Sequence, residues 1–243
     1  MKNNYFFKSQ FSNIYKRPSR QSEVSSQILY GEKFKILSKT KGWLKIKTSF
    51  DSYIGYIKNI NYSQKFNFTH KVNVLKAKIT KSPNNFSNDK SKKFLPFASR
   101  IEILKKHKDF IMFEKNKWIK FKNIKKENYV EKNFFKILKM FINCKYKWGG
   151  KTFDGIDCSA LVQIFFQFNN KFVPRDTKDQ VQFFNKKKKL IRKHLIFWKG
   201  HVAVCLNKNS LIHAYGPKKK VVIMNIEKTI NEIRQNAKLE VIK

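Results

Sequence analysis

One cysteine and two histidines of this chain could form the machinery of a thiol hydrolase. Cys158 lies in the segment DCSALVQIFFQF, where Gly155 breaks the chain just upstream and apolar residues then recur at helical spacing. We therefore expect Cys158 in the first turn of a helix. Unpaired amides and the positive end of the helix dipole favour a thiolate there, and the thiolate is the nucleophilic form of cysteine.

The two histidines open and close a predicted hairpin. His201 begins the apolar run HVAVCL, His213 lies near the end of SLIHAY, and a turn of residues 207–209 separates the runs. Antiparallel pairing would bring the two imidazoles together. His201 could then act on the thiol while His213 orients it through the other ring nitrogen, as in cysteine peptidases.

Five sequence blocks, in the same order, resemble the NlpC (P60) family, papain-like cysteine hydrolases that cut bacterial cell-wall peptides. The resemblance spans roughly residues 129–243. The blocks are YxWGG (Tyr146, Trp148–Gly150), DCS (Asp157–Ser159), PRDT (Pro174–Thr177) with Gln180, FWKGHV (Phe197–Val202) and LIHA (Leu211–Ala214). Five blocks in the right order make a chance agreement very improbable.

The resemblance implies a role for each matching position. Cys158 would be the nucleophile, His201 the general base and acid, and His213 the third, orienting residue. Tyr146 would lie by the oxyanion, together with the backbone amide of Cys158. The mechanism needs no metal and no organic cofactor.

The resemblance also implies substrate-binding residues. In relatives that require a free amino terminus on the peptide, the acidic residue before the cysteine binds that amine, and here it is Asp157. Ser159 and Thr177 match polar positions in the same pocket, although each could equally serve as a local cap. The chain departs from the family at Ala160, where glycine is usual, and at residues 193–194, Lys-His instead of the usual Gly-Asp.

Short alternating runs before this domain predict small β-barrels that must position it. Residues 13–62 resemble a bacterial SH3-like domain, and residues 70–125 read as a divergent second copy, with Trp118 standing where Trp43 did. We interpret both tryptophans as core. Residues 1–12 would be an N-terminal extension and residues 129–243 the catalytic domain. The expected fold class is α+β, a papain-like domain behind two SH3-like barrels.

The charge is strongly basic, with 54 Lys and Arg against 16 Asp and Glu, a formal net charge of +38. Lysines are spread over all segments together with abundant Asn, Ile and Phe, which we attribute chiefly to compositional drift. Such a surface attracts anions nonspecifically, peptidoglycan peptides included. No motif indicates a specific nucleic-acid partner.

The three cysteines, Cys144, Cys158 and Cys205, form no disulfide or CxxC pattern, which favours a reducing compartment. We see no secretory signal and no run of about 18 apolar residues that would indicate a transmembrane segment. The expected location is the cytoplasm.

Together the residues and the resemblance predict a cysteine peptidase. The bond implied is γ-D-glutamyl to diamino acid in L-Ala-γ-D-Glu-diaminopimelate stem peptides, cut during wall turnover or muropeptide recycling. Two alternatives stay open. One is an inert or weakly active wall-binding SH3-like protein, and the other is an acyl transferase or amidase on the same thiol scaffold.

Overall fold

The computed structural model describes residues 4–84, 86, 89–186 and 194–242, and the chain divides into two compact units at Glu131/Lys132. The predicted start of the catalytic domain, residue 129, lies close to this boundary. Antiparallel sheets make up the N-terminal unit, whereas helices and an antiparallel sheet share the C-terminal unit. The predicted α+β class is confirmed.

The first lobe of the N-terminal unit is one antiparallel sheet with the order β3-β2-β6-β5-β4-β1-β7. Its strands are β1 (Asn4–Phe7), β2 (Phe11–Tyr15), β3 (Val24–Leu29), β4 (Lys33–Thr40), β5 (Trp43–Thr48), β6 (Ile54–Lys58) and β7 (Tyr62–Ser63). The central strand β5 alternates buried and partly exposed residues, as expected for a sheet with one face on a core. Its core includes Ile14, Phe34 and Ile46.

The first residues of the chain are part of this lobe. β1 pairs with β4 and β7, and Phe7 is fully buried. The described part of the predicted 1–12 extension therefore comprises β1, a turn and the first two residues of β2. The sequence did not indicate this, because a four-residue strand carries too few alternations to be recognised.

The second lobe is built from three small sheets around one core. Its elements are β8 (His70–Val72), β9 (Lys76–Lys78), β10 (Phe94–Pro96), β11 (Arg100–Ile101), β12 (Lys105–His107), β13 (Phe110–Glu114), β14 (Lys117–Lys120), η1 (Phe121–Asn123) and β15 (Ile124–Lys126). Trp118 is buried here, and Trp43 is buried in the first lobe, so both indoles pack as interpreted. Tyr30 of the first lobe inserts into this second core.

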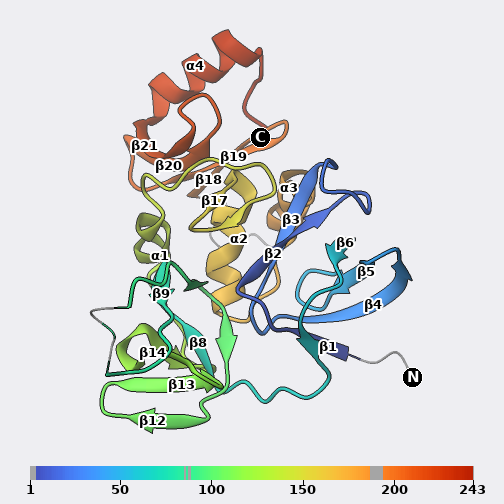
Figure 1. Cartoon of the computed structure of the whole chain (residues 1–243). Helices are drawn as coiled ribbons and strands as arrows, with labels where there is room; N and C mark the ends of the chain where they lie inside the picture. Colours follow the sequence, from blue (N-terminus) through green and yellow to red (C-terminus); the bar gives the residue numbers. More distant parts are fainter. Residues whose placement is uncertain (1–3, 85, 87–88, 187–193, 243) are drawn as a thin grey trace. The chain divides into compact units, whose positions relative to one another are not determined.

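The C-terminal unit surrounds one buried helix. Its elements are α1 (Phe134–Met140), β16 (Lys151–Thr152), β17 (Gly155–Ile156), α2 (Cys158–Phe168), α3 (Thr177–Lys186), β18 (Leu195–Trp198), β19 (His201–Cys205), β20 (Ser210–Tyr215), β21 (Lys220–Asn225) and α4 (Ile226–Ala237). α2 packs on β19 and β20 of the sheet β18-β19-β20-β21, with α1 and α3 as further neighbours (Figure 1). Within the described ranges, no helix is long and apolar enough to cross a bilayer.

Candidate active site

Cys158 is the first residue of α2, as predicted. Asp157 is the N-cap, and its Oδ1 accepts a hydrogen bond of 2.8 Å from the amide of Ala160. Cys158 is only 5 % exposed. The helix therefore begins at the thiol and aims its free amides toward it.

A glycine turn delivers the chain to this position. Gly149 has φ +71°, and a Cβ at Gly150 would come within 2.4 Å of the carbonyl oxygen of Gly155. The amide of Gly149 donates to Oδ2 of Asp157 at 2.9 Å. The glycines of the YxWGG block thus allow a close backbone approach that fixes the residue before the nucleophile.

The sulfur of Cys158 lies against the turn that opens β19. It is 3.9 Å from the carbonyl oxygen of Gly200, and the amide of Val202 hydrogen-bonds to it. The hydroxyl of Thr177, the first residue of α3, is also 3.9 Å away. Because Gly200 and Val202 flank His201, the fold brings the backbone on both sides of the predicted base to the thiol.

Burial dominates the electrostatics of the thiol. It raises the pKa of Cys158 to about 11, and the neighbouring charge of Asp157 acts in the same direction. Hydrogen bonds from Val202, Thr177 and the amide of Ser159 oppose this rise without overcoming it. The expected resting thiolate is thus disfavoured, because desolvation outweighs the helix terminus.

The two histidines form a direct pair, as the predicted hairpin required. β19 pairs antiparallel with β20, and Nε2 of His201 lies 2.9 Å from Nδ1 of His213. Tyr215 stacks on His213 with ring centroids 4.5 Å apart and an angle of 14°. The pair is thereby held in one orientation.

The far end of this pair decides which nitrogen carries each proton. Nε2 of His213 lies 3.3 Å from Sδ of Met224, on β21. A thioether has no proton to give, so His213 must carry its proton on Nε2 and accept at Nδ1. His201 then donates from Nε2, which leaves the lone pair of its Nδ1 free to take a proton.

Both imidazoles are neutral at neutral pH. Burial lowers the pKa of His201 to about 4, and burial together with the charge of His201 lowers that of His213 to about 3. The resting thiol and the two resting imidazoles are therefore all neutral.

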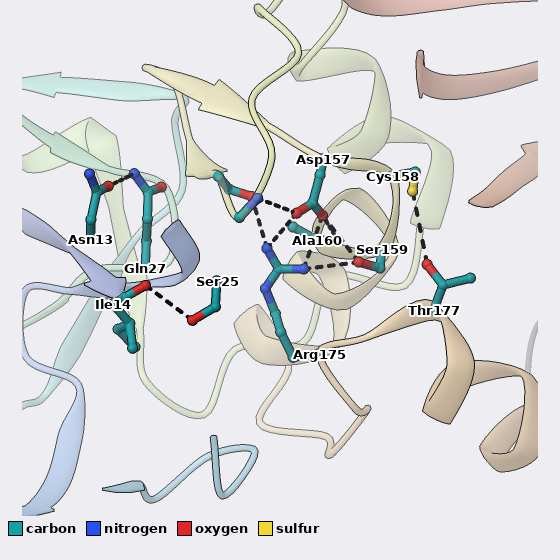
Figure 2. A network of polar contacts seen from close by, with 12 residues as sticks. Asn13, Ile14, Ser25, Gln27, Asp157, Cys158, Ser159, Ala160, Arg175 and Thr177 are labelled. Atoms are coloured by element: carbon teal, nitrogen blue, oxygen red, sulfur yellow. Dashed lines mark hydrogen bonds and ion pairs between the residues drawn. The ribbon is translucent and has the colours of Figure 1, made fainter. Parts of the chain in front are cut away.

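A buried ion pair lies behind the thiol. Nη2 of Arg175 is 2.6 Å from Oδ2 of Asp157, and Nη1 is 3.0 Å from Oδ1 (Figure 2). The hydroxyl of Ser159 donates to Oδ1 of Asp157 at 3.1 Å and accepts from Nη1 of Arg175 at 2.9 Å. Asp157 and Arg175 are both less than 10 % exposed.

This network bears on the predicted pocket residues. The Asp157 carboxylate already accepts from Arg175, Gly149, Ala160 and Ser159, so an incoming amine would have to share it. Ser159 faces the same network, whereas Thr177 faces the sulfur. Substrate binding by these three residues stays a prediction.

Tyr146 is held close to the same charges. Its amide donates to the carbonyl of Lys219, and its ring lies against Gly216. Burial, followed by the charges of Cys158 and Asp157, raises the pKa of its hydroxyl. The hydroxyl therefore stays protonated and can donate to a developing oxyanion.

Two residues of the site had been given no role from the sequence. Arg175 lies in the PRDT block, directly before an acidic residue. This local sequence did not indicate a role for its side chain. Met224 lies on a strand whose contact with His213 only the sheet register reveals. The chain departs from the family at residues 193–194. Lys193 lies outside the described residues, and the ring of His194 packs edge-to-face against Phe135.

Comparisons with known proteins agree with this architecture. Residues 143–238 match the NlpC/P60 family, and residues 14–59 match the bacterial dipeptidyl-peptidase Sh3 domain. The chain is 23 % identical over 233 residues to dipeptidyl-peptidase 6 of Lysinibacillus sphaericus, covering 84 % of each sequence. The predicted combination of an NlpC-type domain with an SH3-like domain is confirmed.

Two solved structures share the fold. An NlpC/P60 family protein from Bacillus cereus ATCC 10987 superposes with a TM-score of 0.74 at 17 % identity, covering 92 % of this chain and 94 % of that one. A novel NlpC/P60 endopeptidase from Photobacterium damselae subsp. piscicida has a TM-score of 0.62 at 15 % identity, covering 99 % and 70 %.

Proposed function

We propose that this chain, which carries an NlpC/P60 domain behind a bacterial Sh3 domain, is a cysteine peptidase of cell-wall stem peptides. The bond we assign is γ-D-glutamyl to diamino acid in L-Ala-γ-D-Glu-diaminopimelate. The match to a dipeptidyl-peptidase supports release of a dipeptide from a free amino end.

The observation that carries the proposal is the His201–His213 pair, in which His201 directly follows Gly200, whose carbonyl lies 3.9 Å from the sulfur of Cys158. A helix terminus holds the thiol, and the His201–His213 bond of 2.9 Å leaves one basic nitrogen of His201 available. An inert wall-binding domain would need neither the paired imidazoles nor a thiol at the same helix end. The arrangement fits nucleophilic catalysis.

Acylation begins when Cys158 attacks the γ-D-glutamyl carbonyl carbon. The thiol proton passes to Nδ1 of His201 as the carbon–sulfur bond forms, and the carbonyl oxygen becomes an oxyanion. The amide of Cys158 and the protonated hydroxyl of Tyr146 donate to that oxyanion. His201 then gives its proton to the leaving amine of the diamino acid, and a thioester remains.

Deacylation uses the same base. His201 takes a proton from a water molecule, whose oxygen attacks the thioester carbonyl. The second oxyanion collapses, the carbon–sulfur bond breaks, and Cys158 recovers a proton from His201. The products are L-Ala-D-Glu and the free diamino acid.

The proposal includes action on imported fragments in a reducing compartment, the cytoplasm. The three cysteines are free thiols in the structure, and the mechanism requires one of them to stay reduced.

The test is hydrolysis of L-Ala-γ-D-Glu-diaminopimelate by the full chain under reducing conditions, followed by mass spectrometry. The wild type should release L-Ala-D-Glu, and Cys158→Ala should release none. Cys205→Ala is the matched control, because Cys205 is another free thiol of the same domain. It should keep wild-type activity.

Two further arms separate the alternatives. An N-acetylated substrate should be cut poorly if a free amine is recognised. Hydroxylamine should intercept the thioester as a hydroxamate, whereas a transferase would release no L-Ala-D-Glu without an added acceptor. Absence of both products with the free-amine substrate would contradict the proposed peptidase.

A further inference from the structure

A second candidate site lies in the N-terminal unit. A cavity of about 550 Å³ opens between the first lobe and the second lobe. We call it the inter-lobe cavity, and its basic and polar wall includes Lys8, Gln10, Lys81, Lys93, Lys115 and Lys117. Its size is that of pockets for small organic ligands.

The charge of the wall is one-sided. Lys117 is paired with Glu114 at 2.6 Å, and Lys81 has Asp89 near it. Within the part of the chain that the structure describes, Lys8, Lys93 and Lys115 have no ion pair. Several lysines thus line one cavity with fewer carboxylates than they could bind.

Lys8 is a partly buried cation at the wall. Nζ of Lys8 lies over the rings of Phe66 and Tyr30, at 3.9 and 4.6 Å from their centroids, and burial lowers its pKa. A partly desolvated ammonium group is stabilised by a nearby anion, so an anionic ligand would complete this wall.

The cavity is preformed, because the two lobes are held together by contacts that include those of Tyr30. Tyr30 is 1 % exposed and belongs to the core of the second lobe. Its carbonyl accepts from the amide of Arg100 at 2.9 Å, and its hydroxyl is 3.1 Å from Oε2 of Glu114. The lining also contains apolar side chains, including Leu95 and Phe113, that can pack on a carbon skeleton.

We propose that the inter-lobe cavity binds a small organic anion with at least two phosphate or carboxylate groups on a carbon skeleton. The lysine ammonium groups bind the anionic oxygens, and the apolar wall holds the skeleton. This site is independent of the peptidase reaction.

The test is isothermal titration calorimetry on the full chain with fructose 1,6-bisphosphate and, separately, citrate, at a constant ionic strength of about 150 mM to screen distant charges. These probes distinguish a phosphate ligand from a carboxylate ligand. The Cys158→Ala background excludes any contribution from the thiol. At least one probe should bind with a stoichiometry near one.

Two matched pairs of lysine substitutions distinguish a specific binding site from general electrostatic attraction. Lys81→Gln/Lys93→Gln removes two charges from the cavity, and Lys35→Gln/Lys39→Gln removes two exposed charges from β4. The first pair should weaken binding at least tenfold and the second less than twofold. Equal weakening by both pairs, or no binding of either probe to the wild type, would overturn the proposal.

Discussion

At the scale of single residues, the site depends on where a few protons are held. The resting pair is a neutral thiol and a neutral imidazole, although the position of Cys158 at a helix terminus suggested a thiolate. The helix terminus lowers the pKa of the thiol, whereas burial raises it. Near-complete burial is the larger effect, and it raises the pKa of Cys158 to about 11.

The alkylation rate of Cys158 measures this balance. A pKa near 11 means that the thiolate fraction at pH 7 is on the order of 10⁻⁴, so the rate with iodoacetamide should rise about tenfold per pH unit up to pH 9. Mass spectrometry of the peptide that contains Cys158 gives this rate. A rate that levels off below pH 7 would instead indicate a resting thiolate–imidazolium pair.

Met224 should control activity through the tautomer of His213. Met224→Leu keeps the volume and removes the only acceptor that the described residues offer to Nε2 of His213. We expect kcat/KM to fall about tenfold, because His213 can then carry its proton on Nδ1 and repel the donor of His201. The measurement is kcat/KM against pH, together with nitrogen chemical shifts of His213.

The control for this variant is Met140→Leu, which changes a partly buried methionine on α1. It should leave both the kinetics and the imidazole shifts unchanged. A purely structural role for Met224 would lower its thermal midpoint without moving the nitrogen shifts of His213.

His213 should also make the fold sensitive to acid. Its folded pKa of about 3 is below the unfolded value of 6.5, so the unfolded chain binds more protons between these values. Stability from this group is therefore complete above pH 6.5 and is lost as the pH falls. The stability advantage of the wild type over His213→Gln should shrink by about 3 kcal/mol from pH 7 to pH 4.

Urea unfolding of both proteins at several pH values tests this difference. Carboxylates titrate in the same range in both chains, so their contribution cancels in the comparison. A constant difference from pH 7 to pH 4 would show that His213 is not held neutral by burial.

At the scale of elements, α2 is positioned as much by polar anchors as by apolar packing. All eleven residues, Cys158–Phe168, are buried. Such a helix has no solvated face, so its end must be fixed by internal partners. Asp157 provides one through Arg175, and Gln180 of α3 donates to the carbonyl of Ser159 at 2.9 Å.

Breaking the Asp157–Arg175 pair from either side should destabilise the C-terminal unit. Asp157→Asn and Arg175→Met should each cost about 3–5 kcal/mol, because each leaves a buried charge without its partner. The double variant should cost less than the sum of the two. Urea unfolding gives all three values.

The exposed pair Arg234–Glu240 serves as the control, and Glu240→Gln should cost below about 1 kcal/mol. Additive losses in the double variant would mean that Asp157 and Arg175 stabilise the helix end separately. This result would also support the prediction that Asp157 binds the amino terminus of the substrate, because its carboxylate would then not depend on Arg175.

The sequence could predict those elements whose signal is local. The helix start at Cys158 follows from a glycine break and an apolar period, and the hairpin of β19 and β20 follows from two apolar runs with a polar turn. The burial of α2 on every side was not predictable, because partner elements decide it. The roles of Arg175 and Met224 depend on contacts across 18 and 11 residues of chain, which no spacing rule reveals.

At the scale of the whole molecule, the two lobes of the N-terminal unit are less separate than their sequence pattern suggested. Tyr30 lies at the end of a first-lobe strand, yet its ring packs in the second core beside Phe113 with centroids 5.4 Å apart. A repeat in sequence predicts two similar folds and says nothing about a shared side chain. The N-terminal unit is therefore one body with two lobes and an internal cavity.

The net charge of +38 should act on substrate capture rather than on chemistry. Stem peptides carry several carboxylates, and a basic chain attracts them over distances that salt screens within about 10 Å at 0.1 M. We expect kcat/KM for the proposed tripeptide to fall severalfold between about 50 and 500 mM NaCl, with kcat nearly constant. Steady-state kinetics across this range is the measurement.

A substrate with its diaminopimelate carboxylates amidated separates this attraction from a general effect of salt. Its kcat/KM should start lower at low salt and change little as salt is added, because it has fewer charges to be screened. If both substrates respond equally, salt acts on the enzyme itself. The lysine excess would then contribute nothing to capture, which favours its origin in compositional drift alone.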